Sequence, residues 1–126
     1  MKALVLAAVV VSITDGDTLR ARIPAWAHTP FEVMGLRIVG IDAPESKKSL
    51  AKCDAEVRRG LAAKDHAKRL IKSGEAVSFT YRGPDKYGQR VLASVTLPNG
   101  DDFAQAMIAA GHARPYTGKT KGSWCP

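Results

Sequence analysis

The chain has 126 residues, 45% of them hydrophobic, which predicts one folded domain over residues 1–126 and excludes a disordered chain. It carries 19 Lys and Arg residues against 12 Asp and Glu residues, a net charge of +7. This charge favours a polyanionic partner, nucleic acid before an anionic membrane, although many small basic proteins bind neither.

The N-terminal apolar run has two interpretations, a secretion signal or the first strand of the fold. Residues 3–11 are all apolar, but this run is shorter than the ~20 residues that a membrane span needs. It continues without a spacer into residues 12–15, whereas a cleavable signal needs a small-residue site before the fold begins. We therefore predict a strand and no membrane partner, with cleavage after Ala8 as the open alternative.

Patterns of apolar and turn residues predict five strands in the chain. We expect them over residues 9–13, 19–23, 31–41, 76–81 and 91–97. Gly16 forms a tight turn between the first two strands, and an irregular tip over residues 23–30 leads into the third.

Two helices are predicted among these strands. The first covers residues 54–72 and should end near a capping glycine, Gly74. Its apolar side is expected to contain Val57, Leu61, Leu70 and Ile71, with Ala62, Ala63 and Ala67 between them. The second should begin at Asp101 or Asp102 and end at Gly111, with inward residues Phe103, Met107 and Ile108. Five short strands with an inserted helix predict a five-stranded β-barrel with helices, of the OB type.

The two cysteines, Cys53 and Cys125, also have two interpretations. A disulfide between them would close a loop of about 70 residues and hold down a C-terminal tail that has little core of its own. It would imply an oxidising location, periplasmic or secreted. Two free thiols would indicate a reducing compartment such as the cytoplasm.

Acidic residues of this basic chain are concentrated in a few turns. Asp17 and Asp42 lie 25 residues apart in two different turns. If their strands are neighbours, the carboxylates meet at one edge of the barrel, where with a backbone carbonyl and water they suit Ca²⁺. Asp15 would lie beside them and act through water. Asp-Gly-Asp is also an ordinary turn sequence, so this motif alone leaves both interpretations open.

Glu45 and Arg37 lie on either side of Asp42 in the sequence. A carboxylate such as Glu45 beside a metal-bound phosphate can orient or deprotonate water, although Glu45 also suits the first turn of a helix. Arg37 precedes Asp42 by five residues, and this odd spacing puts the two side chains on opposite faces of a regular strand. A bulge or a bend near Gly40 must correct this if both serve one site.

A turn over residues 85–88 is followed by Gln89 and Arg90. An arginine at the end of a glycine turn can present a forked donor to phosphate oxygens. Lys86 and Tyr87 in the same turn would hold a nucleotide by its phosphate and by stacking. The same sequence also suits a plain hairpin.

Taken together, four segments resemble the thermonuclease family, the staphylococcal-nuclease-like domains. They are Asp-Gly-Asp-Thr at 15–18, Arg37 with Ile-Asp-Ala-Pro-Glu at 41–45, Asp-Lys-Tyr-Gly at 85–88 with a following arginine, and Ala-Ala-Gly-His-Ala at 109–113. Their order and separations match over about residues 9–116, which leaves residues 117–126 as a C-terminal tail. The resemblance implies an OB-fold barrel with flanking helices and Ca²⁺-dependent hydrolysis of phosphodiester bonds in DNA and RNA.

By position, the resemblance also implies a set of functional residues. The metal ligands would be Asp17, Asp42 and the carbonyl of Ala43. The catalytic residues would be Arg37, Glu45 and Arg90, and the substrate-binding residues Lys86, Tyr87 and Tyr116. The Trp-Cys at 124–125 resembles a short bacterial branch in which this cysteine pairs with one that follows the acidic motif. The extra residue Gln89 is a departure, which requires a local bulge if Arg90 is to reach the site.

Two other classes of function stay open beside a monomeric nuclease. One is a non-catalytic OB-type nucleic-acid-binding or interaction module, since related domains in larger proteins lose the catalytic residues. The presence of Arg37, Glu45 and Arg90 argues against it. The other is a single-strand binder that stacks bases on aromatic side chains. Three Tyr, three Phe and two Trp are few aromatic residues for such a surface.

Overall fold

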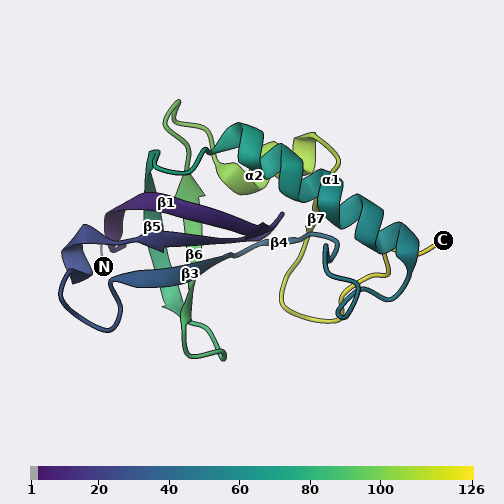
Figure 1. Cartoon of the computed structure of the whole chain (residues 1–126), viewed down its shortest axis with the longest axis horizontal. Coiled ribbons are helices and arrows are strands. Elements are labelled where there is room, and N and C mark those ends of the chain that lie inside the picture. The colour runs from purple at the N-terminus through teal and green to yellow at the C-terminus, as the bar shows by residue number, and fades with distance from the viewer. Residues whose placement is uncertain (1–2) are drawn as a thin grey trace.

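The structure, a computed structural model, describes residues 3–126 and contains a closed five-stranded barrel (Figure 1). The barrel strands are β1 (Val5–Asp15), β2 (Thr18–Arg22), β3 (Val33–Ile38), β5 (Ala76–Pro84) and β6 (Arg90–Thr96). Around the barrel they follow the order β1-β2-β3-β6-β5, in which only β3 and β6 are parallel. This arrangement confirms the predicted five-stranded OB-type barrel.

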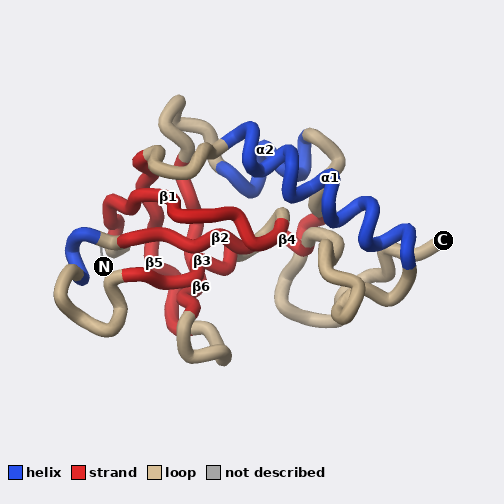
Figure 2. The backbone as a smooth tube through the Cα atoms, viewed as in Figure 1, coloured by secondary structure: helices blue, strands red, loops and turns tan. Residues whose placement is uncertain are grey.

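Two helices and a small two-stranded sheet complete the fold. The helices are α1 (Asp54–Leu70) and α2 (Phe103–Ala109), with a short 3₁₀ turn, η1 (Pro24–Trp26). Figure 2 shows both helices on one side of the barrel, with α1 extending beyond it toward the C-terminus. There β4 (Ile41–Asp42) pairs antiparallel with β7 (Arg114–Pro115), which brings the C-terminal segment to the end of the barrel.

Three strands differ in length from the prediction. β1 begins at Val5 rather than at residue 9, because residues 5–9 form a ladder with residues 76–80 of β5. β5 continues to Pro84, since a bulge at Arg82 lets it stay paired with β6. The single strand predicted over residues 31–41 is wrong. Gly40, with φ of +84°, turns the chain between β3 and β4.

The predicted apolar side of α1 is only partly right. Ala63, Ala67 and Ile71 are buried as predicted, but Leu61 is 48% exposed, and Gly60 and the acidic Glu56 are buried instead. Gly60 lets the helix backbone approach the backbone of Glu45 and Ser46, and Ala63 faces Gly16 in the first turn of the barrel. These small residues therefore make the close contacts, whereas periodicity predicts a contact through Leu61. The helix also ends earlier than predicted, with Ile71 as its C-cap, and Gly74 lies in the turn into β5.

Helix α2 follows the prediction more closely. Asp102 is its N-cap and accepts a hydrogen bond from the backbone N–H of Gln105 at 3.0 Å. Phe103 and Met107 are buried in the core, where they meet the inner faces of the barrel strands, and Ile108 packs partly buried against the same cluster. Within residues 3–126, no helix has the length and apolar character to cross a membrane.

The C-terminal tail is joined to the start of α1. Cys125 forms a disulfide with Cys53, the N-cap residue of the helix, across a sequence separation of 72 residues. The tail also buries Trp124, which is 8% exposed. The disulfide therefore fixes the last residues of the chain beside the loop that follows β4.

We expect Gly60→Ala to lower the free energy of unfolding by about 1–3 kcal/mol, the typical cost of overpacking. A Cβ at this position would overlap the carbonyl oxygen of Glu45 and lie 2.6 Å from the backbone nitrogen of Ser46. At an exposed helical position the same substitution would instead stabilise by about 1 kcal/mol. Urea denaturation measures the change, and Leu61→Ala on the exposed face is the matched control. A Gly60→Ala protein as stable as the wild type would contradict the close contact.

Candidate active site

Asp17 lies at the turn between β1 and β2, where its carboxylate is buried and both of its oxygens accept hydrogen bonds. One oxygen accepts a hydrogen bond from Thr18 Oγ1 at 3.1 Å, and the other accepts one from the backbone N–H of Ala43 at 3.0 Å. Arg37 Nη2 lies 3.7 Å from the second oxygen. Burial raises the pKa of Asp17, and the Arg37 charge and the two hydrogen bonds oppose that rise. Asp17 thus joins the first turn of the barrel to β3 and to the residue after β4.

Asp42 is the second buried carboxylate, and its partners come from the C-terminal tail. Trp124 Nε1 donates a hydrogen bond to Asp42 Oδ2 at 3.1 Å, and Lys121 Nζ lies 3.4 Å from Oδ1. Asp42 and Ala43 line a hollow of about 130 Å³ that Glu45, Lys121 and Trp124 also border. The tail therefore supplies part of the surroundings of a predicted metal ligand.

The Gly40 turn brings Arg37 back toward the acidic residues. Arg37 Nη1 donates to the carbonyl oxygen of Ile38 at 2.6 Å, and Nη2 donates to that of Ile41 at 3.1 Å. The guanidinium thus spans the bend and reaches the carboxylate of Asp17 on the neighbouring strand. The chain bends at Gly40, as the odd sequence spacing requires if Arg37 and Asp42 are to serve one site.

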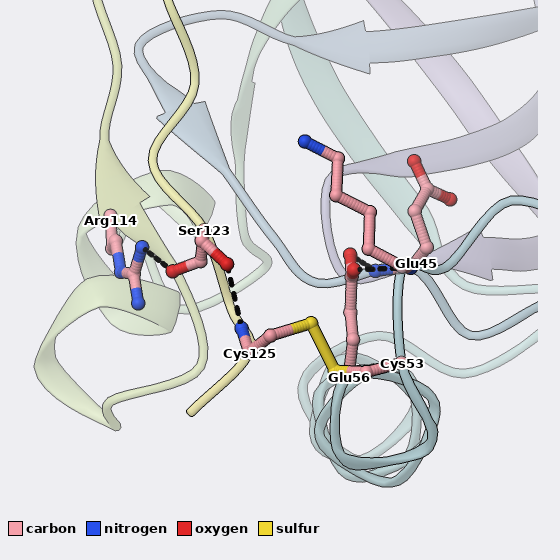
Figure 3. The surroundings of a disulfide bond; sticks show 7 residues. Glu45, Cys53, Glu56, Arg114, Ser123 and Cys125 are labelled. Carbon is pink, nitrogen blue, oxygen red and sulfur yellow. Dashed lines mark hydrogen bonds between the residues drawn. A yellow bond between two sulfur atoms is a disulfide. The ribbon is translucent and has the colours of Figure 1, made fainter.

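Glu45 is held through its backbone rather than through its side chain. Its N–H donates to Glu56 Oε2 at 3.0 Å, and the other oxygen of Glu56 accepts from the backbone of Lys52 at 2.9 Å. Figure 3 shows Glu56 reaching from α1 to this backbone while the side chain of Glu45 points away from the helix. Partial burial raises the pKa of Glu45, and the carboxylates of Asp15 and Asp17 raise it further.

Asp15 has a structural partner in the same loop. Its Oδ1 accepts hydrogen bonds from the hydroxyl of Ser46 and, at 3.4 Å, from the backbone N–H of Ser46. Asp15 therefore ties the β1–β2 turn to the residue after Glu45. Together with Glu56, it fixes the loop that carries the candidate general base.

Arg90 begins β6 and forms a paired, stacked arrangement with the preceding turn. Its Nε and Nη2 both lie 2.9 Å from Asp85 Oδ2, and its guanidinium lies 4.9 Å from the centroid of the Tyr87 ring. Burial raises the pKa of Asp85. The hydrogen bonds that Asp85 accepts from Arg90 and from the backbone N–H of Tyr87, together with the Arg90 charge, outweigh burial and lower the pKa overall. The Asp85 pair fixes the direction of the arginine.

The bulge predicted at Gln89 is wrong. The only irregularity between β5 and β6 lies at Arg82, on the other strand. The backbone N–H of Gly35 in β3 donates to the carbonyl oxygen of Gln89, and Gly35 is the ladder partner of Arg90. The position of Arg90 is therefore set by its pairing with β3 and not by the length of the preceding turn.

One cleft of about 520 Å³ collects most of the predicted basic and aromatic residues. Its lining includes both arginines, Arg37 and Arg90, and all three predicted substrate-binding residues, Lys86, Tyr87 and Tyr116. Lys121 borders both this cleft and the smaller hollow that contains Asp42 and Glu45. The structure therefore places the cationic residues in one cleft and the carboxylates beside it, with Lys121 between them.

Four residues at this site escape prediction from sequence. Gly35, Glu56, Lys121 and Trp124 act through contacts that depend on the folded chain. Glu56 resembles an ordinary acidic residue in the first helical turn, and Gly35 resembles a weak point within a strand. The position of Trp124 next to Cys125 makes it noticeable in the sequence, but it does not predict which residue bonds to its indole.

The chain combines an OB-type barrel, buried carboxylates at one edge of it and two arginines in the adjoining cleft. Arginines in such a cleft suit a phosphate group. The family model of the staphylococcal nuclease homologues matches residues 35–123. The chain belongs to this family.

Two relatives carry the same kind of name. They are an uncharacterized endonuclease of Escherichia coli and a protein of the same name from Escherichia coli O157:H7. Each is 33% identical to this chain over 107 residues, which cover 85% of this chain and 59% of the relative. This chain therefore matches little more than half the length of these relatives.

We expect Gly35→Ala to displace the Arg90 side chain, because a Cβ on Gly35 would lie 2.7 Å from Arg90 Cγ. The aliphatic part of Arg90 lies across this glycine, so the substitution should weaken phosphate binding while leaving the fold in place. Titration with a short oligonucleotide measures the change in Kd. Gly88→Ala in the turn before β6 is the matched control, because no atom lies within 4 Å of the added Cβ and Gly88 has no positive φ. Equal affinities of Gly35→Ala and wild type would contradict the role of this glycine.

Proposed function

We propose that this protein is a Ca²⁺-dependent nuclease that hydrolyses phosphodiester bonds of DNA and RNA. The observation that carries the proposal is the cleft in which Arg37, Arg90 and Lys86 meet, next to the buried carboxylates Asp17 and Asp42. Membership of the staphylococcal nuclease homologues and the endonuclease names of two relatives support the same activity.

The donors at the edge of the barrel fit a calcium ion. Asp17 and Asp42 are 8% and 6% exposed, and both offer the hard carboxylate oxygens that Ca²⁺ prefers. Within residues 3–126, no three His, Cys, Asp or Glu side chains converge to form a metal cage. Asp17, Asp42 and the carbonyl of Ala43 would therefore hold the ion together with water. When bound, the ion neutralises charge on the phosphate and polarises its oxygens.

Glu45 is the residue that acts on the attacking water. Its backbone is fixed by Glu56, and its side chain is directed away from α1. Its carboxylate orients a water molecule or accepts its proton as the oxygen attacks phosphorus and the bond to the leaving oxygen breaks. The pKa of Glu45 is raised by burial and by its acidic neighbours, which makes it a better proton acceptor than an ordinary carboxylate.

The two arginines stabilise charge on the phosphoryl group. Arg37 is held by two backbone carbonyls and Arg90 by Asp85, so neither guanidinium needs to reorganise when charge builds on the phosphate. Lys86 contacts a neighbouring phosphate, while Tyr87 and Tyr116 stack on bases or hydrogen-bond. Phosphates and base faces are common to DNA and RNA, so the proposed enzyme cleaves both.

The disulfide supports an oxidising location for the protein. Disulfides persist in the periplasm and outside the cell and are rare in the cytosol. The bond between Cys53 and Cys125 therefore favours a periplasmic or secreted nuclease.

Cleavage of plasmid DNA and of an RNA tests the proposal directly. We expect cleavage with Ca²⁺, loss of cleavage in excess chelator, and weaker activity with Mg²⁺, which demands stricter octahedral geometry. Glu45→Gln should lower turnover by about 10²-fold or more with the fold intact, the usual worth of a general base. Circular dichroism controls for folding. Equal cleavage with and without chelator would contradict the metal dependence, and nucleic-acid binding without any cleavage would favour a non-catalytic module.

A second test separates the two arginines next to the 85–89 turn. Arg90→Ala should lower turnover by about 10²–10³-fold, because it removes a preorganised donor to the phosphoryl oxygens. Arg82 is exposed and donates to Ser94 Oγ at 3.1 Å outside the cleft lining. Arg82→Ala is thus the matched control and should weaken binding modestly, mainly at low salt. The reverse order of effects would assign the phosphate-binding role to Arg82.

A further inference from the structure

The surroundings of Asp42 contain one residue whose chemistry the proposed reaction does not use. Trp124 is buried, yet its indole N–H is aimed at a carboxylate oxygen rather than at solvent or a backbone carbonyl. A buried indole N–H usually takes a hydrogen-bond partner, but here the partner is one of the two carboxylates that would bind the cation. The contact links the tail directly to the candidate metal site.

The indole is held in place from three directions. The Arg114 guanidinium stacks on its ring at 3.7 Å, and Arg114 Nη1 donates to the carbonyl oxygen of Ser123 at 2.7 Å. Arg114 is itself the ladder partner of Asp42 in the small sheet of β4 and β7. The next residue, Cys125, is bonded to the N-cap of α1, and Figure 3 shows the Arg114–Ser123 hydrogen bond on the tail that this disulfide joins to the helix.

The two oxygens of Asp42 are in different situations. Oδ2 accepts the hydrogen bond from the buried indole, whereas Oδ1 faces Lys121, whose side chain is 48% exposed. A buried indole stacked on Arg114 has little freedom to leave, but an exposed lysine can swing into solvent. A cation that approaches Asp42 therefore finds Oδ2 fixed and Oδ1 open once Lys121 has moved.

We propose that Trp124, held by Arg114 and by the Cys53–Cys125 disulfide, is a positioning residue that orients the Asp42 carboxylate for cation binding, and that Lys121 competes with the cation for the same carboxylate. This inference rests on the proposed function, because it assigns Asp42 to the cation. Hydrogen bonds to a metal-ligating carboxylate fix its rotamer, and their loss typically costs 10–100-fold in metal affinity. Removal of a neighbouring lysine acts in the opposite direction, since it removes repulsion between like charges.

Calcium titration of the substrate-free protein by calorimetry tests both parts. Trp124→Phe keeps an aromatic ring over Arg114 but removes the donor, and we expect it to raise the Kd for Ca²⁺ about tenfold. Lys121→Met should lower the Kd about threefold. Trp26→Phe is the matched control, because Trp26 packs on Phe79 and Tyr81 in the barrel and should leave the Kd unchanged. A purely structural tail would shift the Trp124 and Lys121 variants in the same direction or not at all, which would overturn the proposal.

A double-mutant cycle connects the disulfide to the indole. The variant with both Cys53→Ser and Cys125→Ser should bind Ca²⁺ more weakly than the wild type. Adding Trp124→Phe to it should cause little further loss, because the two changes act on the same contact. Full additivity of the two losses would contradict a role of the disulfide through Trp124.

Terbium luminescence locates the ion independently of affinity. Trp124 and Trp26 are the two tryptophans of the chain, and an indole next to a bound Tb³⁺ sensitises its emission. Emission excited through tryptophan should survive in Trp26→Phe and disappear in Trp124→Phe.

If the wild type binds neither Ca²⁺ nor Tb³⁺, the cation site of the proposed function itself is overturned. If it binds both and Trp124→Phe retains the wild-type Kd, only the positioning role is overturned.

Discussion

The buried carboxylate of Asp17 is the contact on which the rest of the site depends. It lies at the turn between β1 and β2, yet it bonds to the backbone of Ala43 and faces the guanidinium of Arg37. These contacts join three segments that are separate in sequence. A buried carboxylate without such partners would be strongly unfavourable, so the burial of Asp17 holds the loop after β4 against the barrel. Within residues 3–126, every buried polar side-chain atom has a hydrogen-bond partner.

Around this carboxylate, each candidate catalytic group is held by a second residue. Glu56 holds the backbone of Glu45, and Asp85 holds the guanidinium of Arg90. The supporting contacts come from α1 and from the turn before β6. Preorganisation of this kind lets the donors and the acceptor meet a phosphate without first rearranging, which is the main requirement of electrostatic catalysis.

The features that sequence predicts well here are those fixed by local patterns. The five strands, the Asp102 cap and the bend near Gly40 follow from alternation, capping chemistry and spacing. The failures come from contacts between distant segments. Leu61 fits the helical period, but α1 meets the loop after β4 through Gly60, and hydrophobic periodicity does not identify a glycine as a contact residue. Likewise, the extra Gln89 suggests a bulge only until the pairing with β3 is known.

The parallel pairing of β3 with β6 has a consequence for how the sequence of this protein can vary. Gly35 fixes the register of Arg90 from the neighbouring strand, and Asp85, the first residue after β5, directs its guanidinium. Residues 86–89 connect two strands that are already placed. Insertions and deletions within residues 86–89 would then change the outer wall of the cleft, where Tyr87 is exposed, without changing the strand register of Arg90. The fold thus separates the part of the cleft whose shape can vary from the part that must stay constant.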